Sequence, residues 1–277
     1  MSILTARKTG CVTMTNTRTD AVPNGRAQFF VFSGLVFTAS AIATIYFSRS
    51  MSGGMEMPGG WTMSMMWMRM PGQARAASAA MFMLMWLAMM VAMMLPSALP
   101  MLLNFRQSLA GNENRNFGAP VIFAVAGYFM VWLMIGAAVY LAGVMFALAA
   151  MRLEWLSRMV PALSGAALMA AGAIQFTAWK MSGLRRCRTS GCADLPGGDA
   201  LKAGWCHGLK QGSMCFICCL APMLALLALG AMNLTVMMLI AATITTEKLV
   251  PKPELFVRIF GIAALITGAV AIARSLA

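Results

Sequence analysis

Long apolar segments separated by short polar ones run through the chain. A bilayer core of about 30 Å asks for about 20 apolar residues per helix, with a range of about 17 to 25. The stretch 214–250 is too long for one span and tight for two, so we interpret it as two short helices that turn at residues 230–233; without that turn there are six spans. The pattern predicts an all-α, polytopic transmembrane helix bundle of six to seven spans. They are residues 29–47, 77–103, 119–141, 160–179, 214–229, 231–249 and 255–276, forming one domain (29–277) behind a cytoplasmic tail (1–28).

Composition supports a membrane location. The chain is 60% hydrophobic and 10% charged, with a mean hydropathy of +0.77, whereas soluble domains carry about 25% charged residues. The excess of 21 basic over 8 acidic residues fits loops that set topology and meet anionic lipid better than nucleic-acid binding. Fourteen Lys and Arg fall in the segments expected inside and six in those expected outside. We therefore expect a bacterial inner-membrane protein with a cytoplasmic N-terminus, retained first span, periplasmic residues 51–70 and cytoplasmic loop 180–212.

Methionine is the most unusual feature of the composition, with sixteen of thirty between residues 51 and 101. A thioether is a soft donor that suits Cu(I) and Ag(I). In the segment 51–70, several thioethers could wrap one ion; alternatively, the segment lies on the bilayer with Trp61 and Trp67 as interface anchors. The candidate ligands there are Met63, Met65, Met66, Met68 and Met70.

A second group of methionines follows on the predicted helix 77–103. Positions four residues apart lie about 6 Å from each other on one face of a helix. Such a stripe could guide a soft ion, although helix-packing methionines have the same spacing. The candidates are Met85, Met89, Met90, Met93 and Met94.

The strongest signal for a metal is the cysteine cluster Cys215, Cys218 and Cys219. On a helix, Cys215 lies one turn from both of the others, so the three thiols should converge. Three thiolates, or two with the thioether of Met214, suit trigonal Cu(I). Zn(II) would want a fourth ligand, and the candidates are His207, Cys206 and Cys187. The alternative is that these cysteines are small packing residues.

Other features narrow the function. An odd count of seven cysteines does not suggest a disulfide framework. Basic neighbours around Cys187 either lower its thiol pKa or serve as membrane anchors. Glu247 is expected to pair with Lys248 or an arginine. With one histidine and no nucleotide-binding motif, neither a proton-relay pump nor ATP-driven pumping is expected, and we do not expect an enzyme.

Three motifs give the chain a family resemblance: AMM-x-LPS-x-x-P from Ala92, Cys-x-x-Cys-Cys from Cys215, and MNL…EK from Met232 to Lys248. The region from about Trp61 to Pro253 resembles a bacterial family of predicted metal-binding integral membrane proteins, domain of unknown function 2182. The resemblance adds Gln175, Lys180, Cys187 and Arg188 to the motif positions. Gly183, Gln211, Ile217 and Leu220 depart from residues usual in the family, which are cysteine, histidine, glycine and tryptophan.

These observations predict a membrane protein that binds Cu(I) and takes it up, transfers it or delivers it to a metallochaperone or a membrane copper enzyme. Zn(II) is the alternative metal. An accessory subunit of a membrane copper enzyme and a thiol-redox membrane protein are the alternative functions. The partners expected are the lipid bilayer and the protein that exchanges the metal, with no nucleic acid.

Overall fold

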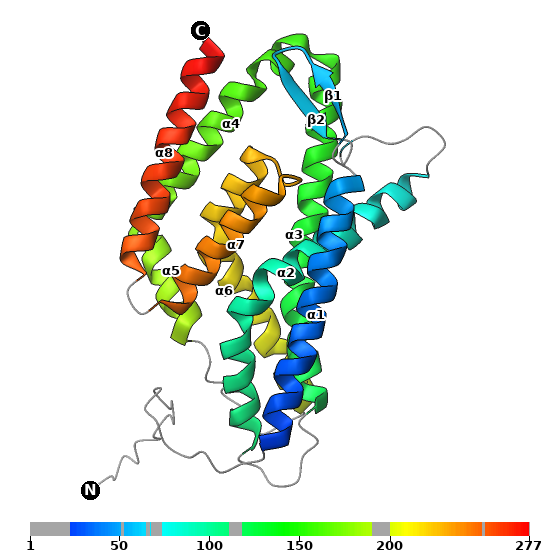
Figure 1. Cartoon of the computed structure of the whole chain (residues 1–277), viewed down its shortest axis with the longest axis vertical. Helices are drawn as coiled ribbons and strands as arrows, with labels where there is room; N and C mark the ends of the chain where they lie inside the picture. The colour runs from blue at the N-terminus through cyan, green and yellow to red at the C-terminus, as the bar shows by residue number, and fades with distance from the viewer. Residues whose placement is uncertain are drawn as a thin grey trace, which may run out of the picture.

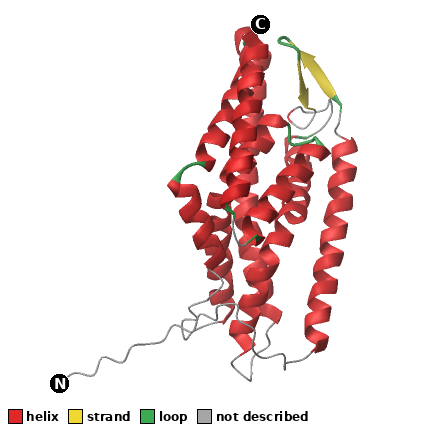
Figure 2. Ribbon diagram, turned by 60° about the vertical axis from the view of Figure 1, so that its left-hand side comes forward, coloured by secondary structure: helices red, strands yellow, loops and turns green. Residues whose placement is uncertain are grey.

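The structure is a computed structural model that describes residues 23–50, 53–64, 67, 74–110, 118–189, 200–250 and 253–276. Helices dominate these residues, with one small β-hairpin at one end of the bundle (Figures 1 and 2). The predicted all-α class is therefore confirmed. The elements are α1 (Pro23–Ser50), β1 (Gly54–Met57), β2 (Trp61–Ser64), α2 (Arg75–Ala110), α3 (Gly118–Arg152), α4 (Glu154–Gln175), α5 (Ala178–Thr189), α6 (Ala200–Leu229), α7 (Leu234–Leu249) and α8 (Glu254–Leu276).

Six helices in the described part of the chain are long and apolar enough to cross a membrane: α1, α2, α3, α4, α6 and α8. The other two, α5 and α7, have only 12 and 16 residues. The expectation of a loop over residues 180–212 is wrong for its described parts. Residues up to Thr189 belong to α5, and α6 already begins at Ala200, so the cysteine-bearing segment is largely helical.

Glycines bring α3 and α6 into close contact. Gly204, Gly208 and Gly212 recur every four residues on α6 and face α3. A Cβ at Gly208 would overlap with the carbonyl oxygen of Ala124, and one at Gly212 would lie 2.9 Å from that of Tyr128. Small residues at this spacing let two helix backbones approach closely. This approach sets Tyr128 beside the cysteines of α6.

The chain reverses between α6 and α7 at residues 230–233, where the sequence predicts a turn. Gly230 has a φ of 99°, a conformation that costs glycine little. Asn233 then caps α7, because its side chain accepts hydrogen bonds from the backbone N–H groups of Thr235 and Val236 at 3.0 and 3.3 Å. The hydroxyl of Ser48 donates to the carbonyl of Met232, 2.6 Å away, so the end of α1 is fixed to this turn.

The β-hairpin is docked on the start of α4. Its turn uses Gly59 and Gly60 at φ values of 107° and 73°. The indole of Trp61 donates to the carbonyl of Ser157 at 2.9 Å, and the Ser157 hydroxyl donates to the carbonyl of Pro58 at 2.8 Å. The hairpin lies at the same end of the molecule as the C-terminal end of α8 (Figure 2). The start of α1 lies at the opposite end (Figure 1).

Candidate metal centre

Three buried thiols meet on α6. The Sγ atoms of Cys215, Cys218 and Cys219 all lie within 4.8 Å of one another, and their side chains are no more than 2% exposed. Cys219 Sγ lies 3.9 Å from Cys215 Sγ and 3.6 Å from Cys218 Sγ. The helical spacing therefore does bring these three thiols together, as the sequence predicts.

The sulfur separations suit a three-coordinate soft ion. With metal–sulfur bonds of about 2.3 Å, three sulfurs in a trigonal plane lie roughly 4 Å apart. The separations of 3.9 and 3.6 Å are close to that value. Among the His, Cys, Asp and Glu side chains of the described segments, this is the one group of three or more that is arranged to hold a metal ion. Three thiols with no fourth ligand in the group match Cu(I) better than tetrahedral Zn(II).

Cys215 has two further polar neighbours from other helices. The Lys248 ammonium, at the end of α7, donates to Cys215 Sγ at 2.8 Å and to Ser97 Oγ at 3.3 Å. The Tyr128 hydroxyl lies 3.0 Å from the same sulfur. The sulfur therefore lies where α2, α3, α6 and α7 meet, beside a positive charge. A nearby cation stabilises a thiolate, the form of cysteine that binds metals.

A buried ion pair contacts the backbone of Cys218. Lys180 Nζ is 2.8 Å from Glu247 Oε2, with both side chains at most 3% exposed. Gln175 donates to the other carboxylate oxygen at 2.9 Å. The expectation that Glu247 pairs with Lys248 is wrong, because adjacent residues on a helix point in different directions; Lys248 reaches the thiol instead.

Lys180 also compensates for a break in the α6 hydrogen-bond ladder. Pro222 has no N–H, so the carbonyl four residues earlier, that of Cys218, loses its usual helical partner. The Lys180 ammonium donates to this carbonyl. The Lys180–Glu247 pair thus links α5 and α7 to the backbone of the turn that carries the cysteines.

Cys187 on α5 is the next nearest thiol. It is half-buried and packs against the cluster that contains the three cysteines. A hydrogen bond with Cys215 is the main cause that raises the Cys187 pKa to about 12, so the pKa is not lowered overall, although the nearby Lys248 charge acts to lower it. Gln211 donates to the Cys187 carbonyl at 3.2 Å. Cys187 lies beside the three thiols without belonging to their group.

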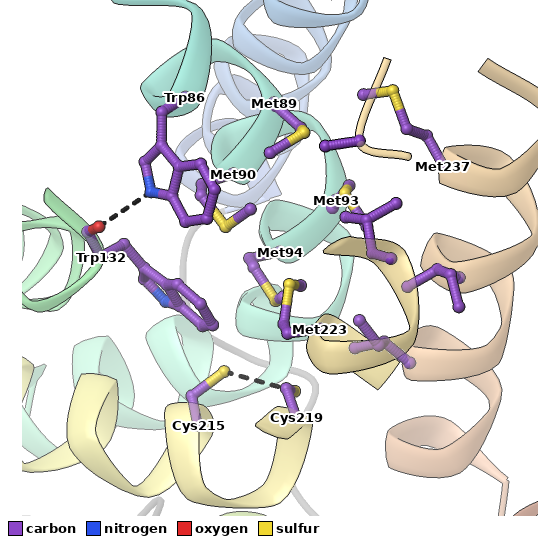
Figure 3. Packing of buried hydrophobic residues seen from close by; sticks show 14 of the residues in the cluster. Trp86, Met89, Met90, Met93, Met94, Trp132, Cys215, Cys219, Met223 and Met237 are labelled. Carbon is purple, nitrogen blue, oxygen red and sulfur yellow. Dashed lines mark hydrogen bonds between the residues drawn. The ribbon is translucent and has the colours of Figure 1, made fainter. Parts of the chain in front are cut away.

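The predicted methionine stripe of α2 is fully buried above the cysteines (Figure 3). It shares one continuous cluster with them, and α6 adds Met223, one turn beyond Cys219. Trp86 and Trp132 close the other side of this region, joined by a hydrogen bond of 2.9 Å from the Trp86 indole to the Trp132 carbonyl. The stripe residues in the cluster are Met85, Met89, Met90, Met93 and Met94.

Cys206 and His207, two of the other candidate ligands, lie outside the thiol group. His207 is eight residues before Cys215, about 12 Å along the helix, and its ring stacks on Phe105 with centroids 4.6 Å apart. Cys206 is exposed. Met214 is half-buried on α6. The structure does not bring Cys206 or His207 into the thiol group.

Of the candidates in the segment 51–70, only Met63 lies within the described residues. It is 2% exposed and packs in a small cluster with Ala147 and Ala150 of α3. Trp67 packs against both this cluster and the main core, so aromatic residues lie between the hairpin and the α2 stripe. The remaining four, Met65, Met66, Met68 and Met70, lie outside the described residues.

Sequence reasoning missed the roles of Tyr128, Ser97 and Lys248 around Cys215. Lys180 was named only as a motif position of a resembling family, and Lys248 only as a motif position and a possible partner of Glu247. One available signal was the run of glycines at 204, 208 and 212, which predicts a close helix neighbour for the cysteine segment. Another was Pro222, which implies a free carbonyl at Cys218.

Comparison with known protein families indicates copper as the metal to which the chain's family is related. The chain belongs to the PpoB2 family, described as a copper chaperone family, whose model matches residues 83–271. The matched region contains the α2 stripe from Met85 onward, the three clustered cysteines, Lys180 and Lys248. No curated protein and no solved structure gives a significant match to the chain.

Proposed function

We propose that the protein is a membrane-embedded copper chaperone that holds Cu(I) on Cys215, Cys218 and Cys219. The observation that carries the proposal is the buried group of three thiols, whose separations suit a trigonal soft ion. The copper chaperone family supports copper as the cargo. Cys187 is suited to a further ligand because it lies beside the group. The region that resembles domain of unknown function 2182 overlaps with the matched region, and we take both to describe the same family.

We further propose a multi-pass location in the bacterial inner membrane, with the N-terminus in the cytoplasm. Six candidate spans and many exposed apolar side chains on α1, α3 and α8 support the membrane. The N-terminal part of α6, to which Lys202 and Lys210 belong, lies away from the hairpin (Figure 1). The bias of Lys and Arg toward the expected inner segments supports this orientation.

In this orientation, the methionines capture the ion outside and the cysteines hold it further in. The buried stripe of α2 adjoins the thiols, since it belongs to the same cluster, and Trp67 packs against both that cluster and the cluster of Met63. Thiolate binds Cu(I) more strongly than thioether, so affinity rises inward. A metallochaperone or a membrane copper enzyme would then exchange the ion with Cys187 and its neighbours.

The test is Cu(I) affinity of the full-length reduced protein, measured against a Cu(I) chelator. The variant Cys215→Ser/Cys218→Ser/Cys219→Ser nearly conserves volume and removes the soft ligands. Its affinity should fall by more than the roughly 10- to 100-fold typical of changes around a metal site. Cys206→Ser is the matched control, because this exposed thiol lies outside the group. Equal affinity of the triple variant and the control would refute the proposal.

A further inference from the structure

The positive charge beside the thiols is an unusual feature for a metal site. The Lys248 ammonium approaches Cys215 Sγ to 2.8 Å, and Ser97 holds it from the other side at 3.3 Å. A lysine cannot ligate a metal while it is an ammonium, and its charge repels any cation. A charged group in this position therefore needs an explanation other than coordination.

We propose that Lys248 is the specificity-determining residue of the site and makes it select a monovalent soft ion over divalent ions. The inference rests on the proposed function and names the residue that sets its ion selectivity. Lys248 repels a divalent ion twice as strongly as a monovalent one. The three-thiol geometry alone does not exclude Zn(II), because thiolates bind Zn(II) tightly and Cys187 lies beside the group as a candidate fourth ligand.

The geometry gives the size of the effect. An ion about 2.3 Å from Cys215 Sγ lies within about 5 Å of the Lys248 nitrogen, given the 2.8 Å between nitrogen and sulfur. At that distance and an effective dielectric constant of about 20, one extra unit of ion charge corresponds to roughly a hundredfold in affinity. Partial exposure of Lys248 reduces this value, so we expect at least about a tenfold effect.

A polar shell fixes the charge in place. Ser97 comes from α2 and Tyr128 from α3, and both contact the Lys248–Cys215 pair. Glu247, the neighbouring residue on α7, is engaged by Lys180 and Gln175. The Glu247 carboxylate is thus paired with Lys180 and does not neutralise Lys248. The Lys248 charge therefore acts on the Cys215 thiol that it contacts.

The experiment compares the ratio of Cu(I) to Zn(II) affinity in full-length reduced proteins, each ion measured against its own chelator. Lys248→Gln removes the charge, and the ratio should fall at least about tenfold. Lys248→Arg keeps the charge and should keep the ratio. Lys210→Gln, an exposed lysine on α6, changes the net charge equally and should also leave the ratio unchanged.

A structural role for Lys248 would lower both affinities in proportion, and that result would overturn the inference. If Lys248→Gln does not fold, a competition experiment on the native protein tests the selectivity. Ag(I) and Cd(II) are both soft ions but differ in charge, so each is added to the protein loaded with Cu(I). Ag(I) should displace Cu(I) and Cd(II) should not; displacement by Cd(II) at similar concentration would refute the selectivity. A native protein that binds no Cu(I) would instead refute the proposed function.

Discussion

Replacing Lys180 by methionine tests how the cysteine-bearing turn of α6 is supported. Methionine has a long, unbranched side chain similar in length to the apolar stem of lysine, and it enters a position that is 1% exposed. It leaves the carboxylate of Glu247 buried without its cation, and it removes the donor to the Cys218 carbonyl. Glu247 retains only the hydrogen bond from Gln175.

The expected loss follows from these contacts. Removing one partner of a buried ion pair costs about 3–5 kcal/mol. An unsatisfied buried carbonyl costs about 1–3 kcal/mol, and the two losses overlap because they share one ammonium. We therefore expect Lys180→Met to lower the free energy of unfolding by about 3–5 kcal/mol, a large part of the stability of a typical domain.

Equilibrium unfolding in mixed detergent micelles, followed by tryptophan fluorescence, measures this difference. Arg158→Met is the control, because its ion pair with Glu154 is equally short at 2.6 Å but about two-thirds exposed. Such an exposed pair four residues apart contributes about 0.3–0.5 kcal/mol. The double variant Lys180→Met/Glu247→Gln should recover at least about 2 kcal/mol relative to Lys180→Met, because no unpaired charge remains buried. A loss under about 1 kcal/mol, or a double variant as unstable as the single one, would contradict the reasoning.

Three further predictions concern packing, topology and capture. Gly208→Ala should cost about 1–3 kcal/mol in unfolding free energy, because its Cβ would overlap with the α3 backbone; Gly34→Ala, where nothing lies within 4 Å, should cost nothing. A membrane-impermeant thiol reagent should label Glu56→Cys only from the periplasm and Cys206 only from the cytoplasm, and labelling of both from one side would refute the orientation. Leucine in place of the loop methionines conserves side-chain volume but should reduce copper accumulation when external copper is low. Accumulation should recover when external copper is high. Identical uptake curves for the variant and the native protein at matched expression would show that the loop methionines have no metal role. The positions are Met63, Met65, Met66, Met68 and Met70.

Local periodicity was enough to predict the all-α class and the convergence of the three thiols. Both depend on contacts within one helix, where residues three and four apart lie together. The buried face of α2 followed from the same rule. Helix starts were harder, and the residues from Ala200 to Gly212 were expected in a loop because lysines and glycines interrupt the apolar pattern.

Contacts between helices could not be predicted in the same way. Tyr128 lies 87 positions from Cys215 and Ser97 lies 151 from Lys248, and no periodicity relates residues so far apart. The pairing of Glu247 with Lys180 instead of Lys248 depends on which face of α7 meets α5. Only packing determines that face.

Lys180 and Lys248 have different tasks at the two ends of the cysteine motif. Lys180 holds the Cys218 backbone, at the carbonyl that Pro222 leaves free, and does so as part of an ion pair with no net charge. Lys248 contacts the Cys215 sulfur itself, so its charge acts on whatever the sulfur binds. Neutralising Lys180 should therefore change stability more than ion selectivity, and neutralising Lys248 should do the reverse. Measuring the free energy of unfolding and the Cu(I)/Zn(II) affinity ratio of both variants therefore distinguishes a residue that stabilises the site from one that determines which ion the site binds.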